Sequence, residues 1–469
     1  MTFQLTIGGR ESSCVETFAV IDPATGREFA QCPLATVEHL DHAVAAARAA
    51  FPAWSALPID QRAALLNRFA EALAAECDDL AAILSREQGK PVRSAVGEIQ
   101  GSIYWIRTTA GFRPPVERID QPDGSRIEIH RRPLGVVGSI TPWNFPVMIA
   151  IWHVIPALLA GNTVVLKPSP NTPLATLRMV EIANRHLPAG VWNVVTGDVE
   201  IGSGIARHPD INKVVFTGST PTGRAIMRDG AGNLKRLTLE LGGNDAAIVL
   251  PDADVDTIAP QIFSYAFGNS GQICAAIKRV YVHDTLHDAL AERLAALAAA
   301  AKVGPGDDPD TQYGPVQNRR QYDYVRALAE DARMQGGRFL AGGEPLAGDG
   351  YFFPLSVVVD VTDGNRIVDE EQFGPVLPII RYSDVEDVLA RANAGDNGLG
   401  GSVWSADVGR AAELAQRLEC GTAWVNHHAK ISPDIPFGGA KQSGIGVEFG
   451  LHGLDEYLQL QTVRLPAGA

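Results

Sequence analysis

The chain has 469 residues, of which 46% are hydrophobic and 20% are charged, and its formal net charge is −14. This length exceeds what a single hydrophobic core supports, so two or three domains are expected. The negative charge argues against nucleic acid or an anionic membrane surface as the main partner. The five cysteines, Cys14, Cys32, Cys77, Cys274 and Cys420, are scattered and form no zinc-binding or disulfide pattern. We therefore expect neither a bound metal nor a disulfide framework.

No targeting or membrane segment is evident. The start, from Met1 to Leu5, lacks the basic and apolar parts of a signal peptide. The longest apolar stretch, from Val147 to Ala160, is interrupted by His153 and Pro156 and is too short to cross a bilayer. A reducing cytoplasm is the simplest expectation.

The first part of the chain is predicted to be helical. The stretch from Val37 to Arg86 is Ala-rich, and Pro52 and Pro58 are expected to interrupt its helices. A second helical stretch runs from Val92 to about Gly111. The segment from Arg126 to His130 then alternates polar and apolar residues, which is typical of a half-exposed strand.

After this segment, short apolar runs alternate with helical ones. Strands are predicted at Gly135–Ile140, Thr163–Leu166, Val191–Val195 and Lys213–Phe216, and helices at Ile149–Leu159, Leu174–His186 and Ile201–Arg207. The pattern restarts at Ala246–Leu250 and continues to about Val425, and Tyr457–Leu465 is a plausible edge strand. This alternation predicts an α/β fold with parallel sheets that are covered on both faces.

Three separated residues together indicate acyl chemistry. Cys274 lies among small residues in SGQICAA, Glu240 lies in LELGG, and Asn144 lies in TPWNFP. A thiol nucleophile, a base and an oxyanion donor are the parts that chemistry at a carbonyl requires. Taken alone, the cysteine would be interpreted as a small buried hydrophobic residue, and the glutamate as a surface residue of an alternating strand.

Two motifs follow predicted strands, where ligands collect in open parallel sheets. Lys167 can direct its ammonium at ribose hydroxyls or a phosphate, although a solvated lysine in a turn is an alternative. The string FTGSTPTG at 216–223 allows close backbone approach to a pyrophosphate. Its spacing is not GxGxxG, so a plain β–α turn with a helix cap also stays open.

Together these strings resemble the aldehyde dehydrogenase superfamily over nearly the whole chain. The matching segments, in the family's order, are TPWNFP (141–146), KPS (167–169), FTGS (216–219), LELGG (239–243), GQIC (271–274), EEQFGPV (370–376) and PFGGAKQSG (436–444). The resemblance implies oxidation of an aldehyde to the carboxylic acid with NAD or NADP.

The resemblance also implies the catalytic roles. Cys274 would attack the aldehyde carbon to give a thiohemiacetal, which becomes a thioester after hydride transfer. Asn144 would donate to the oxyanion, and Glu240 would activate the water that hydrolyses the thioester. Glu448 matches a glutamate that the family can use as a second proton acceptor.

The implied cofactor site draws on many segments. Its residues would be Ile140, Thr141, Pro142, Trp143, Lys167, Ser169, Gly197, Gly218, Ser219, Gly223, Leu241, Glu371 and Phe373. Without the resemblance, Glu371 would equally fit a solvated acidic turn. Many members that prefer NAD carry a glutamate three residues after the lysine, but Pro170 stands here. Because no arginine or second lysine follows closely, we expect NAD as the cofactor and leave NADP open.

The resemblance places the substrate tunnel near Val147, Met148, Ile151 and Trp152, around Ile273 and Ala275, and near Phe437. These residues are largely apolar, which suits an aliphatic or aromatic aldehyde. Lys430 and His428 would instead meet the carboxylate of a semialdehyde, or belong to a solvated loop. The sequence identifies neither the aldehyde nor the pathway.

The implied architecture has three parts. A Rossmann-type dinucleotide-binding domain would comprise residues 1–118 and 134–243, and a catalytic domain residues 244–442. A small β bridging element, residues 119–133 and 443–469, would pair subunits into a homodimer or a homotetramer, since edge strands invite a partner.

Three other readings compete with this one. In a CoA-acylating semialdehyde dehydrogenase the water-activating glutamate is missing, and Glu240 is present. A non-catalytic structural or binding member would be expected to lack Cys274 or Asn144. A thiol hydrolase would need a histidine partner, and the seven motifs contain none.

Overall fold

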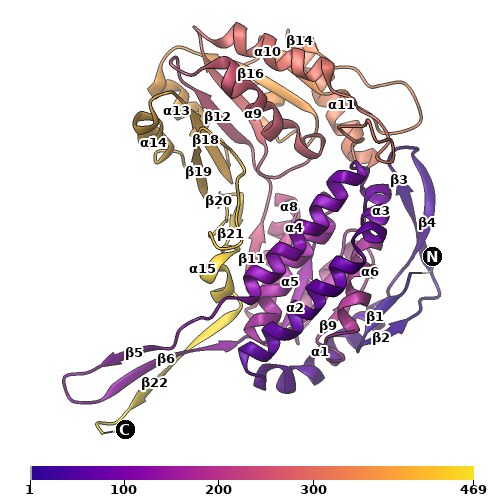
Figure 1. Cartoon of the computed structure of the whole chain (residues 1–469), viewed down its shortest axis with the longest axis vertical. Helices are drawn as coiled ribbons and strands as arrows, with labels where there is room; N and C mark the ends of the chain where they lie inside the picture. The colour runs from indigo at the N-terminus through magenta and orange to yellow at the C-terminus, as the bar shows by residue number, and fades with distance from the viewer. Residues whose placement is uncertain (1–2, 469) are drawn as a thin grey trace.

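The computed structural model describes residues 3–468, and these contain two large sheets, one three-stranded sheet and two two-stranded pairs (Figure 1). In order across the first sheet, the strands are β2 (Arg10–Ser12), β1 (Leu5–Ile7), β9 (Trp192–Val194), β8 (Thr163–Lys167), β7 (Val136–Ile140), β10 (Lys213–Thr217), β11 (Arg236–Glu240) and β21 (Gly444–Ile445). The strands from β9 to β11 run parallel, whereas β1, β2 and β21 pair antiparallel at the edges.

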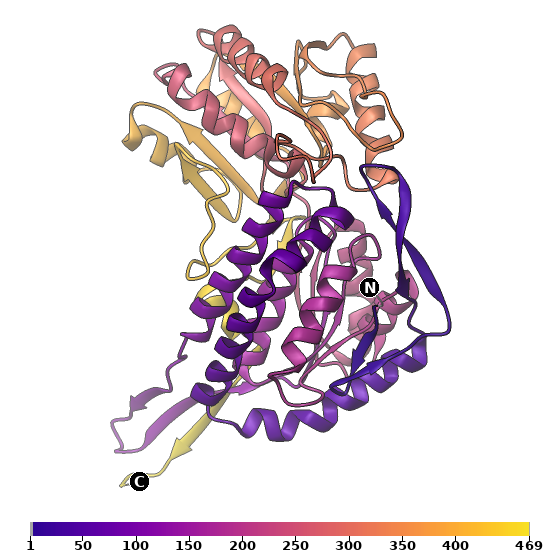
Figure 2. The same ribbon diagram turned by 45° about the vertical axis from the view of Figure 1, so that its right-hand side comes forward.

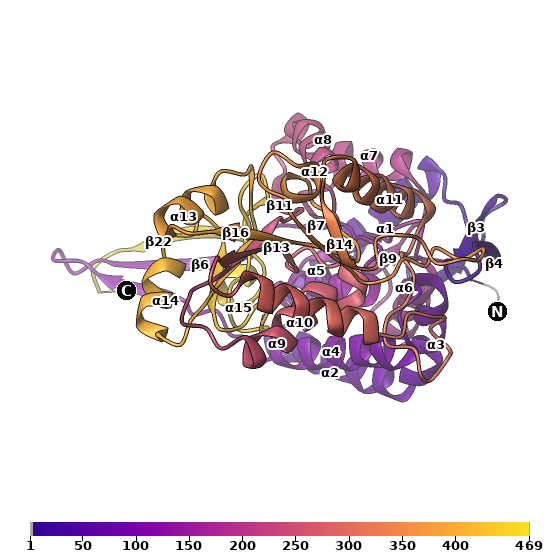
Figure 3. The ribbon, with the colours of Figure 1, turned by 90° about the horizontal axis from the view of Figure 1, so that it is seen from above.

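Helices cover both faces of this first sheet, as Figure 3 shows from above. One face carries α1 (Val37–Ala56), α7 (Val199–Arg207), α8 (Thr220–Gly230) and the short η1 (Ala231–Asn233). The other carries α5 (Pro146–Ala160) and α6 (Leu174–Asn184), with α2 (Ile59–Ala75), α3 (Cys77–Gln88) and α4 (Val92–Ala110) packed outside them. The parallel strands are therefore buried on both sides, which explains their continuous apolar sequences.

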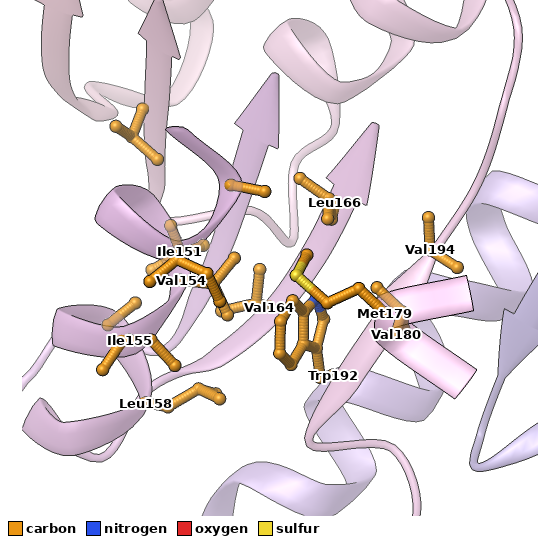
Figure 4. Close-up of a cluster of buried hydrophobic side chains, with 14 of the residues drawn as sticks. Ile151, Val154, Ile155, Leu158, Val164, Leu166, Met179, Val180, Trp192 and Val194 are labelled. Atoms are coloured by element: carbon orange, nitrogen blue, oxygen red, sulfur yellow. The ribbon is translucent and has the colours of Figure 1, made fainter. Parts of the chain in front are cut away.

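The core of this lobe lies between the sheet and α5 and α6 (Figure 4). Trp192 is completely buried there, and its ring meets the Phe69 ring edge-on, with 5.7 Å between centroids. Helix α5 is apolar around most of its circumference, as expected for a helix enclosed on all sides. Ile151 and Val147, expected beside the substrate tunnel, are completely buried in this core instead.

The second large sheet forms the other lobe. In order across the sheet, its strands are β14 (Arg338–Ala341), β15 (Ser356–Val359), β16 (Val376–Tyr382), β13 (Ile277–His283), β12 (Asp245–Val249), β18 (Gly400–Trp404) and β19 (Thr422–Val425). One face packs on α9 (Val255–Phe267) and α10 (His287–Ala300). The other packs on α11 (Arg319–Met334), α12 (Arg366–Asp369), α13 (Val385–Asn393) and α14 (Val408–Ala415). Only β14 is antiparallel to its neighbour among these strands.

Smaller elements complete the fold. They are the hairpin of β3 (Thr17–Asp22) and β4 (Arg27–Pro33), the pair of β17 (Asn397–Gly398) and β20 (Ala440–Lys441), the short η2 (Gly268–Gly271) and α15 (Gly450–Asp455). A three-stranded sheet has the order β22 (Leu458–Leu465), β6 (Arg126–Pro133) and β5 (Glu117–Asp120). Figures 1 and 2 show this sheet as an arm that projects from the body of the molecule.

The predicted α/β class with largely parallel sheets is confirmed, and four details differ. Pro52 lies inside α1, whereas Pro58 separates α1 from α2. The strands β1 to β4 were not predicted, because they are short and partly exposed. The small sheet begins at Glu117 rather than at 119, and β21, expected in the bridging element, pairs with β11 of the first sheet. Within residues 3–468, no helix is both long and apolar enough to cross a membrane.

A buried ion pair joins α4 to the start of α5. Nζ of Lys90 donates to Oε2 of Glu98 over 2.5 Å, and both side chains are almost completely excluded from solvent. The other carboxylate oxygen of Glu98 accepts the backbone N–H groups of Val147 and Met148, at 3.0 and 3.1 Å. These donors belong to the first turn of α5 and have no partner within the helix. Glu98 therefore fixes where α5 begins.

Replacing Lys90 with Met should destabilise the protein by about 3–5 kcal/mol, because it leaves the Glu98 carboxylate buried without its cation. Urea unfolding followed by tryptophan fluorescence measures the change. As a matched control, Lys302→Met breaks the exposed pair with Asp310 and should leave the midpoint unchanged. Equal midpoints for Lys90→Met and the wild type would contradict the assignment.

Candidate active site

A cavity of about 200 Å³ lies at the carboxyl ends of β10 and β11, beside the loop that leads into β13. Its lining residues are Pro142, Trp143, Asn144, Thr217, Gly218, Ser219, Leu241, Gly242, Cys274, Gln321, Glu371 and Phe373. The structure thus brings together most of the predicted catalytic and cofactor residues. Thr217, Gly242 and Gln321 were not predicted, although Thr217 and Gly242 lie inside quoted motifs.

Cys274 follows a strained turn. Asn269, Ser270 and Gly271 all have positive φ, at 49°, 57° and 74°. A Cβ on Gly271 would lie 2.2 Å from the Gly374 carbonyl oxygen, so this position requires glycine. The Ser270 hydroxyl donates to the Gly314 carbonyl over 2.7 Å and helps to hold the turn. Cys274 itself is half-buried at the end of this loop.

Asn144 is held by two hydrogen bonds to the same loop and by a third from Lys90. Its side-chain amide Nδ2 donates to the Gln272 carbonyl over 3.0 Å. Its backbone carbonyl accepts from Lys90 Nζ at 3.0 Å and from Asn269 Nδ2 at 3.1 Å. The buried ion pair of Lys90 therefore also positions the amide that faces the cysteine loop.

Negative charge surrounds the thiol. Burial and, to a smaller extent, the nearby carboxylates of Glu371, Glu240 and Asp245 together raise the pKa of Cys274 to about 12, while Lys278 opposes them. Lys278 is itself buried, donates to the Gly271 carbonyl over 3.1 Å, and has its pKa lowered chiefly by burial. In the free protein Cys274 is therefore a protonated thiol at neutral pH.

Glu240 and Glu448 form a buried acidic pair. Burial raises the pKa of Glu240 well above its usual range, and Glu448 raises it further. Neither carboxylate oxygen of Glu240 has a hydrogen-bond partner among the described residues. Glu448 Oε1 lies 3.2 Å from Nε2 of the completely buried His153, without the alignment of a hydrogen bond. His153 contacts the hydroxyls of Ser139 and Thr217, at 3.0 and 2.9 Å, and was not predicted in any site.

Glu371 lines the same cavity as the thiol. It accepts the backbone N–H of Gly243 over 3.1 Å, and burial raises its pKa to about 7, against the effect of Lys278. A Cβ on Gly242 would lie 2.2 Å from Glu371 Oε2, so this position requires glycine. Phe373 meets Trp143 edge-on, with 5.3 Å between ring centroids, and the two rings form one wall of the cavity.

The remaining predicted cofactor residues lie outside this cavity. Ile140 ends β7 and pairs with Lys167, and the Thr141 N–H donates to the Lys167 carbonyl over 3.1 Å. Ser169 is buried two residues beyond Lys167, and Gly197 follows β9. Gly223 lies in α8, where a Cβ would meet the Leu241 side chain at 2.6 Å.

The predicted tunnel residues lie around a cluster of aromatic rings. Trp152 packs against Trp105 and Phe449, with centroids at 5.5 and 4.9 Å, and Phe437 stacks on Phe449 at 6.1 Å. Trp105 and Phe449 were not predicted, and no local pattern marks them. Met148 lies one helical turn before Trp152 on α5, and Ile273 and Ala275 flank Cys274.

The sequence suggested that His428 meets a substrate carboxylate or lies in a solvated loop, but it does neither. Its ring is completely buried, with Nε2 3.3 Å from Asp245 Oδ2 and Nδ1 2.9 Å from the Ser402 hydroxyl. The ring is enclosed because Trp424 covers it, with 4.8 Å between centroids. Lys430 is exposed.

Comparison with known proteins finds relatives along nearly the whole chain. The model of the aldehyde dehydrogenase family matches residues 10–463. Aldehyde dehydrogenase LUC3 of a Fusarium species is 37% identical over 467 residues, which cover 99% of each chain. The 3-sulfolactaldehyde dehydrogenase of Pseudomonas putida is 38% identical over 455 residues, 96% of this chain and 94% of the relative. The NAD+ complex of the Bacillus cereus aldehyde dehydrogenase has a TM-score of 0.97 at 35% identity and covers 99% and 97% of the two chains.

Because the pKa of Cys274 is about 12 in the free protein, its thiolate fraction should rise about tenfold per pH unit between pH 7 and 10. The rate of iodoacetamide alkylation of Cys274, measured by mass spectrometry of the labelled peptide, should follow this rise without a plateau. Lys278→Met should slow alkylation, since it removes the cation that lowers the pKa, whereas the distant Lys302→Met should not. A plateau below pH 9 would contradict this interpretation.

Proposed function

The chain belongs to the aldehyde dehydrogenase family, and from this premise we propose that it oxidises an aldehyde to the carboxylic acid with NAD+, through a covalent intermediate on Cys274. The observation that supports the proposal most is that Cys274, Asn144, Glu371 and the segment from Thr217 to Ser219 line one cavity. A nucleophile, an amide donor and groups suited to a nicotinamide ribose therefore lie within reach of one ligand.

The residues present fit a nicotinamide dinucleotide. Gly242 leaves room for Glu371, and glycine is needed at 218 because a Cβ there would lie 2.4 Å from the Phe216 ring. Glu371 would hold the nicotinamide ribose, Lys167 the adenosine ribose, and Ser219, which precedes the first turn of α8, the pyrophosphate. NAD+ is supported by the complex of the Bacillus cereus relative. When bound, the cofactor supplies the acceptor for the hydride.

Cys274 begins the reaction at the substrate carbonyl. Its sulfur forms a bond to the carbonyl carbon, the thiol proton is released, and the carbonyl oxygen becomes an oxyanion. The side-chain amide of Asn144 donates to that oxyanion, and the backbone carbonyl of Asn144 is fixed by hydrogen bonds from Lys90 and Asn269. One such donor typically contributes about 3–4 kcal/mol to the transition state. Loss of hydride from the same carbon leaves a thioester on Cys274.

Glu240 then acts on water. Its raised pKa makes it a stronger proton acceptor than an ordinary carboxylate, once it has lost its own proton. It removes a proton from the water, whose oxygen forms a bond to the thioester carbon; the carbon–sulfur bond then breaks, so that Cys274 leaves as the thiolate and the acid is released. Glu448, which raises the pKa of Glu240, is the nearest candidate to receive that proton next.

We infer an apolar substrate from the ring cluster around Trp152, since Trp105, Phe437 and Phe449 place aromatic surface next to the predicted tunnel. Cys274, Trp152 and Ile431 are partly buried residues packed on the same core. An aliphatic or aromatic aldehyde fits this lining better than a charged one.

Cys274→Ala should abolish aldehyde-dependent reduction of NAD+, because no thiohemiacetal can form. Glu240→Gln should still release about one reduced cofactor per site in a rapid burst, followed by turnover at least about a hundredfold slower than in the wild type. Stopped-flow absorbance at the reduced nicotinamide band separates the two phases. Cys420→Ala is the matched control, since Cys420 is also a partly buried thiol whose pKa is raised to about 12. Turnover by Cys274→Ala would refute the mechanism.

We also propose the domain roles and the assembly. Residues 1–118 and 134–243 would bind the dinucleotide, residues 244–442 would carry the nucleophile, and the arm would join subunits. Strands β22 and β5 form the two unpaired edges of the arm, and Leu460, Ile119 and Val116 expose 57%, 46% and 47% of their surface there. The five cysteines are free thiols, which fits a reducing cytoplasm.

Light scattering on the purified protein should give about two or four times the chain mass of 50.0 kDa. A monomer is not expected, because exposed edge strands with apolar residues favour pairing with another chain. A mass of one chain at micromolar concentration would contradict the proposed assembly without affecting the proposed chemistry.

A further inference from the structure

Lys167 and the turn after β9 lie at the same edge of the first sheet. Strands β8 and β9 are parallel neighbours, with Leu166 paired to Val194, and the Val195 N–H donates to the Leu166 carbonyl over 2.9 Å. The residues that follow the two strands, Lys167 and the segment 196–198, therefore adjoin. In contrast, Pro170 can neither accept a hydrogen bond through its side chain nor carry a charge.

The turn after β9 directs Asp198 toward this lysine. Gly197 has φ of +139°, and a Cβ there would lie 2.6 Å from Cγ1 of Ile201, so glycine is needed to begin α7 at this angle. Asp198 caps α7, and Gly202 lies four residues later on the same helix face. A Cβ at Gly202 would be 3.9 Å from both Cδ and Cε of Lys167. The face that carries Asp198 therefore lies along the lysine side chain.

The charge of Asp198 acts on Lys167. Burial lowers the pKa of Lys167 to about 8, and Asp198 is the group that opposes this shift. Asp198 is exposed and makes no side-chain hydrogen bond to the helix that it caps. Lys167 Nζ donates to the Pro168 carbonyl over 3.1 Å. Lys167 is buried, whereas the carboxylate of Asp198 faces solvent at this edge.

Without the carboxylate of Asp198, this edge of the sheet would favour binding of a phosphate group. The ammonium of Lys167 and the first turn of α7, with its unpaired N–H groups, are both attractive to an anion. The carboxylate of Asp198 belongs to the N-cap residue of α7 and acts on the charge of Lys167. A ribose hydroxyl can donate to that carboxylate, whereas a phosphate with two negative charges is repelled by it.

We propose that Asp198 makes this enzyme selective for NAD+ over NADP+, by placing a carboxylate where the 2′-phosphate would otherwise meet Lys167 and the start of α7. The inference rests on the proposed use of a nicotinamide dinucleotide. It assigns the discrimination between NAD+ and NADP+ to the turn after β9, the strand beside β8. Pro170 cannot discriminate between them, because its side chain carries neither a charge nor a hydrogen-bond acceptor.

Equilibrium binding of NAD+ and NADP+, followed by tryptophan fluorescence without aldehyde, tests the inference. Asp198→Asn should tighten NADP+ binding at least tenfold, because the amide keeps an acceptor for the ribose and removes the charge. NAD+ binding should not tighten, because a neutral amide accepts the ribose hydroxyl less strongly than a carboxylate does. Glu200→Gln is the matched control, since it removes the same charge from the first turn of the same helix. It should change NADP+ binding less than threefold.

Asp198→Ser, which keeps a capping side chain, provides a second variant if the amide disturbs α7, and it should show the same gain. Unchanged NADP+ affinity in both folded variants, or an equal gain in Glu200→Gln, would overturn the inference while NAD+ binding by the wild type still upheld the proposed function. A wild type that bound neither nucleotide would instead overturn the proposed function.

Discussion

The buried ion pair between Lys90 and Glu98 is the interaction on which the site depends most. Glu98 satisfies the backbone donors at the start of α5, and Lys90 satisfies the carbonyl of Asn144, just before that helix. The pair therefore connects the helix that crosses the core with the turn that faces the cysteine loop. Since a buried ion pair is seldom a gain in stability over apolar residues of the same size, its value here lies in fixing one geometry. An apolar pair would leave the backbone N–H groups of Val147 and Met148 without partners and would remove one of the two donors to the Asn144 carbonyl.

A second constraint is the concentration of acidic groups around the thiol. Burial and mutual repulsion raise the pKa of Cys274, Glu240 and Glu371 together, while Lys278 opposes the shifts of Cys274 and Glu371. Such a site holds its protons in the free protein and favours a ligand that brings positive charge. The oxidised nicotinamide ring is such a ligand. The acidity of the nucleophile is therefore coupled to occupancy of the neighbouring cavity, since each added positive charge favours the thiolate.

The sequence allowed the α/β class, most central strands and the motif residues of the cavity to be predicted, because these depend on local patterns. Buried parallel strands such as β8 and β10 are continuous apolar runs, and the cavity residues belong to short strings rich in glycine and proline. Contacts between distant segments could not be predicted, because no local sequence pattern indicates them. Trp105 and Phe449 meet Trp152 only through tertiary packing. His428, which looked like a loop residue, is buried because Trp424 and Asp245 enclose it.

Because sequence patterns do not show contacts between distant segments, they mark position 170 as relevant to cofactor selectivity but not position 198. A family pattern compares residues at fixed spacing from Lys167, and Pro170 is the conspicuous difference at that spacing. The sheet offers a second approach to the same lysine, because parallel pairing of β8 with β9 brings a residue 31 positions away to the same edge. A ribose binds to a place in space rather than to a segment, so a carboxylate from either strand can serve it. Discrimination between cofactors can therefore move between neighbouring strands while the lysine stays fixed.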